Sequence, residues 1–330
     1  MKPSTKISDS TSTTNFDWPE DAYQKFGTEF QLLSHNYHQS PLFSDDALIT
    51  LLDNYPRKWL QCYTMGVDPL KYKEWTPVHI DKLSGEEIIA AVRRGRIWVN
   101  VIRLNEYQQD YVELVDDMYA KINDKCPNIT RAKGSFSQLL ISSPGVQVYY
   151  HLDADPNMLW HLKGTKKLWV YPNKDPRFAT QKHIEEIIGQ ERHENVPYEL
   201  WFDEHAHAIE LQPGQVLSWP QHSPHRIENV DMNISLATSF QSRESIRLNS
   251  VHAANHFFLK PIGISNRSLE TQGVVPALKE ISYRGLNKLK LLKTQTRSAS
   301  YISNLVADPS SESGMSKIEK ESRTAFSYVD

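Results

Sequence analysis

The sequence has 330 residues, 39% of them hydrophobic and 10% aromatic, which is enough for a core in one large β domain with helical additions or in two small domains. A formal net charge of -3 gives no general reason to expect nucleic acid as a partner, and no run approaches the roughly 18 apolar residues of a membrane helix. Two cysteines and an N-terminus without an apolar signal segment favour a cytoplasmic protein with reduced thiols and no membrane partner.

The first part of the chain passes from a polar lead into mixed elements. Residues 1–15 are mostly Ser and Thr and have almost nothing to bury, so we expect them to be disordered. Residues 16–135 are interpreted as an N-terminal α/β flank. Within this flank, Ser84 and Glu87 have the spacing of a capping box and predict the start of a helix that ends at Gly95.

Between residues 136 and 245 the pattern changes to short strands. Runs such as FSQLLIS, KKLWVYP and QVLSW are rich in β-forming residues and are separated by Gly, Pro and Asn. An insertion at residues 175–202, with a helix at 183–188, interrupts these runs. Residues 246–293 are expected to be helical, and the Ser-rich residues 294–330 to be disordered. The sequence therefore predicts a mainly β sandwich, barrel or jelly roll with helical flanks.

The first candidate for chemistry is the tripeptide His151-Leu152-Asp153. Side chains alternate along a strand, so His151 and Asp153 project from the same face. One neutral imidazole and one carboxylate are two of the three ligands in the facial triad that binds Fe(II) and leaves other positions open. A lone H-x-D pattern often arises by chance, so the prediction of a metal site depends largely on finding a third ligand.

That third ligand is expected on a later strand, and residues 213–229 have a suitable pattern. A Pro-Gly turn is followed by an apolar strand, a Pro-rich bend and a second strand. Either His222 or His225 can supply the ligand. We prefer His225, because it begins the run HRIEN, in which an inward strand position fixes the direction of the ring. His222 lies in the bend between two prolines and is interpreted as a loop residue.

These segments together resemble the Jumonji-C and cupin-like 2-oxoglutarate oxygenases, in particular a bacterial cupin-like branch. The run HLDADPNMLWHLKGTKKLWVYP is similar to the family's H-x-D, downstream Asn, G-x-K and strand ending in Pro. The run PGQVLSWPQHSPHRIEN is similar to its Pro-Gly turn, apolar strand and following histidine. The resemblance covers residues 136–245 and extends more faintly to Leu292. It implies a double-stranded β-helix (cupin or jelly-roll type) with N-terminal α/β elements and C-terminal helices.

The resemblance also assigns roles to individual residues. His151, Asp153 and His225 match the iron ligands, and Lys166 matches the lysine that pairs with the distal carboxylate of 2-oxoglutarate. The remaining two matches, Asn157 and Ser239, fall where the family has polar residues that line the cosubstrate pocket. The implied cofactor is Fe(II), with 2-oxoglutarate as cosubstrate.

Two positions depart from the family's pattern. The position three before the first histidine often carries a hydroxyl for the cosubstrate, but here it is Val148. Three nearby residues offer a replacement hydroxyl: Tyr149, Tyr150 and Ser137. The family usually has an acidic residue directly after the Pro-Gly turn, but this sequence has Gln215 there. We interpret this difference as a change in the turn alone.

Less specific interpretations of these residues stay open. Asp153 precedes a turn-forming segment and can be a turn residue, and Lys166 follows a glycine closely and can be a solvated hairpin lysine. His161 alternates with apolar neighbours, as a core histidine does. His205 and His207 form a second pair on one face without an obvious carboxylate partner, and are interpreted as loop and strand-edge residues.

The resemblance implies an Fe(II)/2-oxoglutarate-dependent dioxygenase that hydroxylates a protein side chain or a small metabolite. The alternative is a metal-binding cupin without redox activity, such as an isomerase or a ligand sensor, which has no need of a cation at Lys166. A third interpretation, a scaffold without activity, conflicts with the retention of all three ligand candidates. Because related enzymes dimerise through this region, we expect residues 250–292 to support a homodimer.

Overall fold

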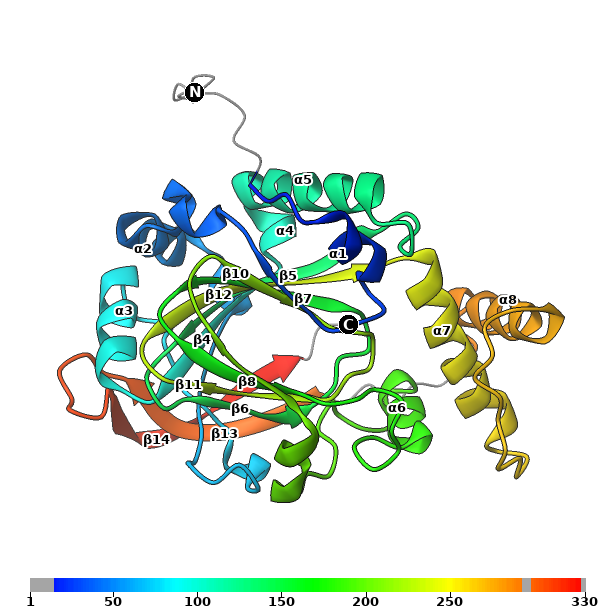
Figure 1. The fold of residues 1–330 in the computed structure, drawn as a ribbon. Coiled ribbons are helices and arrows are strands. Elements are labelled where there is room, and N and C mark those ends of the chain that lie inside the picture. Colours follow the sequence, from blue (N-terminus) through cyan, green and yellow to red (C-terminus); the bar gives the residue numbers. More distant parts are fainter. Residues whose placement is uncertain (1–14, 293–297, 328–330) are drawn as a thin grey trace.

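Eight consecutive strands, from Lys133 to Gln241, form the central body of the computed structural model, which describes residues 15–292 and 298–327 (Figure 1). The predicted disorder of residues 1–14, 293–297 and 328–330 falls outside the described residues. The eight strands are β5 (Lys133–Ser142), β6 (Gln147–His151), β7 (Asn157–Lys163), β8 (Lys166–Val170), β9 (His207–Leu211), β10 (Gln215–Ser218), β11 (His225–Asn229) and β12 (Asn233–Gln241).

The order of these strands defines the fold. In one sheet β10, β7, β12 and β5 are neighbours, and in the facing sheet the order is β6, β11, β8 and β9, with every pairing antiparallel. The chain thus crosses repeatedly between two sheets that face each other. This connectivity is a double-stranded β-helix, so the predicted fold class is confirmed.

Elements from the N-terminal flank enlarge the first sheet and cover its outer face. Strand β1 (Gln31–Ser34) pairs with β10, and on the other side β4 (Ile97–Ile102), β2 (Leu60–Thr64) and β3 (Thr76–Pro77) extend the sheet beyond β5. The helices of this flank are α1 (Glu20–Lys25), α2 (Asp45–Asn54), α3 (Gly85–Arg94), α4 (Leu104–Tyr107) and α5 (Gln109–Lys125). Short 3₁₀ turns occupy Tyr37–Gln39, Pro41–Phe43, Arg57–Trp59 and Tyr72–Glu74.

The capping box predicted at the start of α3 is present. The Ser84 side chain accepts a hydrogen bond from the Glu87 amide, and the Glu87 carboxylate accepts one from the Ser84 amide. Gly95 follows the last residue of the helix, as predicted. Local side-chain chemistry therefore sets the start of α3, and the helix ends before Gly95.

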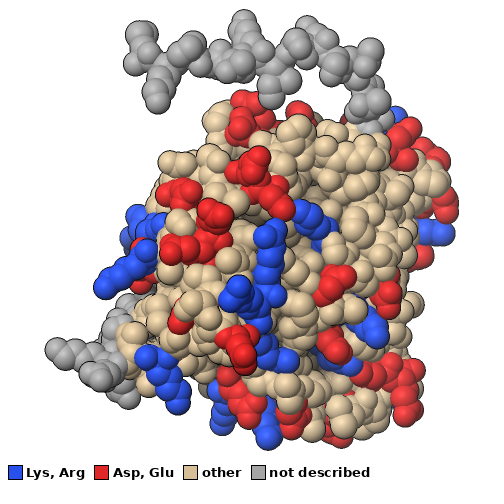
Figure 2. All heavy atoms as spheres, turned by 90° about the vertical axis from the view of Figure 1, so that its left-hand side faces the viewer, with Lys and Arg blue, Asp and Glu red and all other residues tan. Residues whose placement is uncertain are grey.

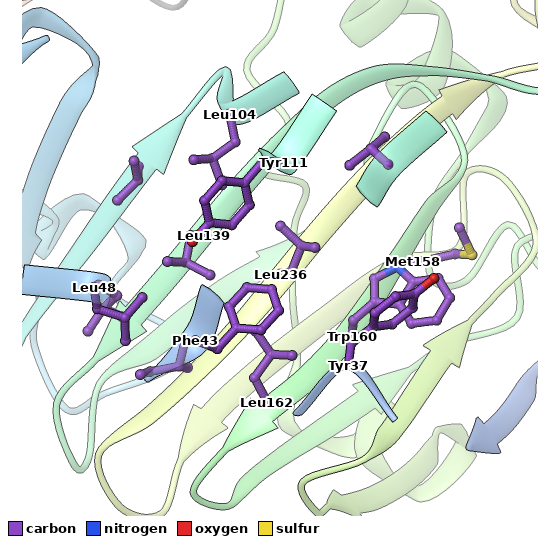
Figure 3. Close-up of a cluster of buried hydrophobic side chains, with 14 of the residues drawn as sticks. Tyr37, Phe43, Leu48, Leu104, Tyr111, Leu139, Met158, Trp160, Leu162 and Leu236 are labelled. Carbon is purple, nitrogen blue, oxygen red and sulfur yellow. The ribbon is translucent and has the colours of Figure 1, made fainter. Parts of the chain in front are cut away.

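Strand alternation divides the core into two layers. Leu139, Leu236 and Trp160 point away from the barrel and pack with helical and loop residues such as Leu48 and Tyr111 (Figure 3). The alternate positions point between the sheets, where they form an interior cluster that includes Leu140, Leu159, Leu168, Leu217 and Ala237. Burial on both sides explains why β7 and β10 carry apolar residues at consecutive positions.

The surface formed by α2 and α3 carries charges of both signs. Figure 2 shows acidic and basic side chains interspersed on this side of the molecule. Arg93, near the end of α3, pairs with Asp45 at the start of α2 at 3.2 Å. Among the described helices, none is long and apolar enough to cross a membrane.

The insertion between β8 and β9 begins directly after Val170. It contains α6 (Gln181–Ile188), which includes the predicted helix, and a 3₁₀ segment at Leu200–His205. Since Val170 pairs with His225 at the start of β11, the insertion leaves the barrel at the end where the candidate ligands lie. It packs against α7 (Arg243–Ala254), which continues into a π-helical turn at Asn255–Leu259.

Helix α8 (Val274–Lys288) projects at the side of the molecule beyond α7 (Figure 1). Its Val274, Leu278 and Ile281 side chains are 58–74% exposed and share one helical face, whereas Glu280 ties the opposite face to Arg247 of α7.

The homodimer predicted through residues 250–292 stays a prediction, and this apolar face of α8 is where we expect the contact. Light scattering on a chain ending at Gln272, and on the Ile281→Glu variant, should show a fall from dimer to monomer mass. Arg284→Ala, on a charged position of α8, should leave the mass unchanged. Equal masses for all variants and the full chain, whether monomer or dimer, would contradict this prediction.

The C-terminal segment departs from the sequence prediction. Residues 294–330 were expected to be disordered, but Ser298–Ala307 (β13) and Met315–Ser327 (β14) form an antiparallel hairpin. Backbone hydrogen bonds attach it to the body, from His79 N to Leu305 O at 2.9 Å and from Ala307 N to His79 O at 3.0 Å. These bonds do not depend on apolar side chains, so the polar composition of this segment gave no sign of them.

Candidate metal centre

The three predicted metal ligands meet at one end of the barrel. His151 ends β6 and His225 begins β11, and the two residues are paired directly across these neighbouring strands. Their ring centroids are 4.2 Å apart. Asp153, two residues after His151, lies 3.9 Å from His151 Nε2 through Oδ1 and 3.6 Å from His225 Nε2 through Oδ2. One ligand atom from each residue lies within 4.8 Å of the others, so these side chains could hold one metal ion.

The backbone fixes which nitrogen of each histidine faces this site. His151 Nδ1 lies 2.8 Å from the carbonyl oxygen of Tyr149, and His225 Nδ1 lies 3.1 Å from that of Ser223. A carbonyl only accepts, so each Nδ1 carries the proton and each Nε2 offers a lone pair to a metal. Burial and the neighbouring His151 ring lower the pKa of His225, which favours the neutral imidazole that metal binding requires.

The two pocket residues implied by the resemblance lie beside the three ligands. Asn157, at the start of β7, donates a hydrogen bond from Nδ2 to Asp153 Oδ2 at 3.2 Å. Its buried Oδ1 has no hydrogen-bond partner among the described residues. Ser239 is paired with Asn157 across β12 and β7 and is half-buried. Asn157 therefore orients the carboxylate of a ligand candidate, in addition to facing the barrel interior.

The remaining histidines lie apart from this group. His222 directs Nε2 at Asn249 Oδ1, 2.9 Å away, which leaves His225 as the third ligand candidate. His161 is bonded through both ring nitrogens within the core. His207 stacks on Phe30 at the outer strand β9.

His205 lies in the insertion, where its ring contacts those of Phe178 and Trp201. His207 begins the outer strand β9. The second pair of histidines predicted from the sequence, His205 and His207, is therefore not part of the group formed by His151, Asp153 and His225. The interpretation of both as loop and strand-edge residues agrees with these positions.

Lys166 lies inside the same barrel. It begins β8, its side chain is 1% exposed, and no carboxylate of the described residues pairs with it. Burial lowers its pKa to about 7. Lys167, the next residue, points outward and is exposed, opposite Glu210 and Glu228 of the neighbouring strands. The interior thus contains a buried cation without a protein anion, which is costly unless an anion is bound.

This burial has a measurable cost in the ligand-free protein. Because the folded pKa of Lys166 lies below the usual 10.5, the unfolded chain binds the proton more tightly and the charge destabilises the fold. Lys166→Met should raise the free energy of unfolding at pH 7 by a few kcal/mol, at about 1.4 kcal/mol per pKa unit. The stability gained by the variant should shrink as the pH rises from about 7 to 10.5, because the folded wild-type protein loses the Lys166 proton first. Above about pH 10.5 the lysine is neutral in the folded and the unfolded state, and the gain should vanish. Thermal denaturation across this range measures it, and a lower melting temperature for the variant would contradict the expectation.

The three candidate replacements for the hydroxyl missing at Val148 occupy different places. Tyr150 donates its hydroxyl to Phe178 O in the insertion at 3.0 Å, and Ser137 Oγ bonds Asn105 on the outer side of the sheet. Tyr149 packs in the interior cluster, where its buried hydroxyl lies against the backbone of Gly66 without a well-formed hydrogen bond. Of the three, only Tyr149 packs with the interior cluster, and its hydroxyl faces Gly66 of the N-terminal flank.

Sequence reasoning missed several neighbours of the candidate ligands. The Trp219 ring lies 4.7 Å from that of His225, and Glu194 O accepts a hydrogen bond from Leu152 N at 3.1 Å. Asn249 of α7 contacts the loop before His225. Trp219 lies in the same motif as His225, which is a usable signal, whereas Glu194 and Asn249 come close only through tertiary folding.

Comparison with known proteins finds structural similarity at low sequence identity. No protein-family model and no curated protein matches it. An X-ray structure of E. coli ycfD has a TM-score of 0.47 and 14% sequence identity, over 85% of this chain and 68% of that chain. The structure of YcfD, a ribosomal oxygenase from Escherichia coli, in complex with cobalt and 2-oxoglutarate has a TM-score of 0.46 and 16% identity over the same shares. At this level of similarity, the assignment of the fold rests on the strand order of the chain itself.

Proposed function

We propose that this chain is an Fe(II)- and 2-oxoglutarate-dependent oxygenase that hydroxylates its substrate. The observation that carries the proposal is the convergence of His151 Nε2, His225 Nε2 and the Asp153 carboxylate at one end of the barrel. Two imidazoles and one carboxylate on one side of a metal form the facial triad of non-haem Fe(II) oxygenases, which leaves positions for a chelating cosubstrate and O2.

Lys166 supports the choice of a dicarboxylate cosubstrate. Its position on β8 is four residues before Val170, which pairs with His225, so its backbone lies about 13 Å along the strand from the level of the triad. An extended lysine side chain is long enough to span part of such a distance. A dicarboxylate that chelates the metal at one end would place its other carboxylate near this cation, and such a charge-assisted pair would offset the cost of burying the lysine.

The chain's own residues would then bind and orient the reactants. His151, His225 and Asp153 would hold the metal, and Asn157 would fix the Asp153 carboxylate. Fe(II) and 2-oxoglutarate supply the oxidative chemistry, in which one atom of O2 enters the substrate and the other enters succinate, with release of CO2. The apolar interior would exclude water from the inner side of the site. The substrate would enter from the end of the barrel where the β8–β9 insertion and α7 lie.

The competing function is that of a metal-binding cupin without redox chemistry. Such a protein would use the triad but would have no role for a buried cation on the far side of the metal. The fully buried, unpaired Lys166 is the observation that favours the oxygenase.

Turnover of the cosubstrate tests this proposal. Purified protein supplied with Fe(II), O2 and 2-oxoglutarate, together with peptide and metabolite pools, should form succinate. The Asp153→Ala variant should form none. Fe(II) binding by the wild-type chain without any binding of 2-oxoglutarate would favour the cupin without redox activity.

A further inference from the structure

Two loops carry the candidate metal ligands. Residues 152–156 connect β6 to β7 and include Asp153, and residues 219–224 precede His225 at the start of β11. These loops lie about 70 residues apart in sequence, yet metal binding requires their ligand atoms to stay within a fraction of an ångström of the productive geometry. Whatever links the loops therefore helps to determine metal affinity.

A single amide, that of Asn249 in α7, contacts both loops. Its Oδ1 accepts hydrogen bonds from Gln221 Nε2 and from His222 Nε2, each at 2.9 Å. Its Nδ2 donates to Asp155 Oδ1 at 3.1 Å. Gln221 Nε2 also donates to Ala154 O at 2.9 Å, which joins the two loops directly beside Asn249.

The donors and acceptors of this network are complementary. Burial lowers the pKa of His222 to about 4, so its ring is neutral and Nε2 can carry the proton that Asn249 Oδ1 accepts. This acceptor role orients the amide, so Nδ2 faces the Asp155 carboxylate. The second oxygen of Asp155 accepts from Gln241 Nε2 at 3.0 Å and from Ser135 Oγ at 3.3 Å.

The backbone of the second loop needs such support. His222 has a φ of +63°, in the left-handed region that a residue with a side chain rarely adopts, and its side chain is 4% exposed. Its ring packs between Asn249 and His252, which both belong to α7. Contacts from α7 therefore hold a strained residue three positions before His225.

We propose that Asn249 is a positioning residue of the metal centre, which holds the Asp153 loop and the His225 loop in register through Asp155, Gln221 and His222. This inference rests on the proposed metal site. It makes α7 a structural component of that site. Partners that orient metal ligands typically contribute about 10- to 100-fold to metal affinity.

An exchange of hydrogen-bonding groups tests the proposal. Asn249→Asp keeps an oxygen for Gln221 and His222 but sets two carboxylates against each other. Asp155→Asn leaves one oxygen, which can accept from Asn249 or from Gln241 but not from both in the wild-type arrangement. Each single variant should bind Co(II), a stand-in for Fe(II), about 10- to 100-fold more weakly than wild type. The double variant restores the hydrogen bond with reversed polarity, since the new amide at position 155 can donate to position 249 and still accept from Gln241. It should recover most of the affinity.

The visible spectrum of bound Co(II) provides a readout that general destabilisation would not change. We expect an altered spectrum in both single variants and a spectrum like that of wild type in the double variant. Arg247→Ala is the matched control, because Arg247 ties the same helix to Glu280 of α8 and does not touch the ligand loops. Its affinity and spectrum should equal those of wild type.

Three results would contradict the inference, and they differ from failure of the proposed function. Equal Co(II) affinity and spectrum in wild type and Asn249→Asp would exclude a positioning role. A double variant as weak as the sum of the single variants, or an Arg247→Ala variant as weak as Asn249→Asp, would show that general stability is responsible. Absence of Co(II) binding in wild type would instead overturn the metal site itself, and this inference with it.

Discussion

Replacing Lys166 by alanine is expected to leave Fe(II) affinity nearly unchanged and to weaken 2-oxoglutarate binding severely. Removing one partner of a buried charge-assisted pair typically costs about 2–5 kcal/mol, which corresponds to a loss of affinity of about 30- to 4,000-fold. Val148 supplies no hydroxyl to share the distal carboxylate, so the lysine should carry a large part of this binding energy. Calorimetric titration of Fe(II) and of 2-oxoglutarate under anaerobic conditions measures both affinities.

Lys167 provides the matched control for this experiment. It precedes Leu168 on the same strand but points outward and is exposed. Lys167→Ala should change the affinity for 2-oxoglutarate by well under tenfold, as expected for an exposed charge worth at most about 1 kcal/mol. Equal affinity in wild type and Lys166→Ala would move the carboxylate site elsewhere in the barrel.

The second large effect concerns the metal ligands. His151→Ala, Asp153→Ala and His225→Ala should each abolish tight Fe(II) binding while the fold is retained, since each variant removes one of three ligands. His222→Ala should retain Fe(II), with at most the loss of about 10- to 100-fold expected for a partner of a ligand loop. Metal titration together with circular dichroism distinguishes lost ligation from unfolding. Loss of iron in His222→Ala with retention in His225→Ala would show that the third ligand is misassigned.

Strand periodicity predicted which side chains would share a face, and His151 and Asp153 do converge, although Asp153 lies in the loop after β6. Because alternate residues of a strand point the same way, HLD predicted that His151 and Asp153 would converge, and KK predicted that Lys166 and Lys167 would diverge. The pairing of β6 with β11 then brings His225 beside His151. The sequence could not specify this register, because the two strands lie far apart in the chain and pair only in the folded sheet.

Contacts made by polar side chains across the fold were beyond the sequence. Nothing in the run HRIEN or in α7 indicates that Asn249 would bind Gln221 and His222, because the bonds depend on where the helix docks. The resemblance placed Asn157 among the residues that line the cosubstrate pocket, but it gave no sign of the hydrogen bond to Asp153. The C-terminal hairpin was missed because backbone groups attach it at His79 and only a few apolar residues, such as Leu305 and Ala307, pack on the core.

The most direct test of the Fe(II)/2-oxoglutarate assignment is an anaerobic titration of 2-oxoglutarate into the Fe(II)-loaded protein. Chelation of a 2-oxo acid to Fe(II) held by His151, Asp153 and His225 should produce a metal-to-ligand charge-transfer band that saturates with added 2-oxoglutarate. Asp153→Ala should give no band, and Lys166→Ala should reach the same band only at much higher concentration. Wild-type protein that binds Fe(II) tightly but develops no band at saturating 2-oxoglutarate would contradict the oxygenase assignment.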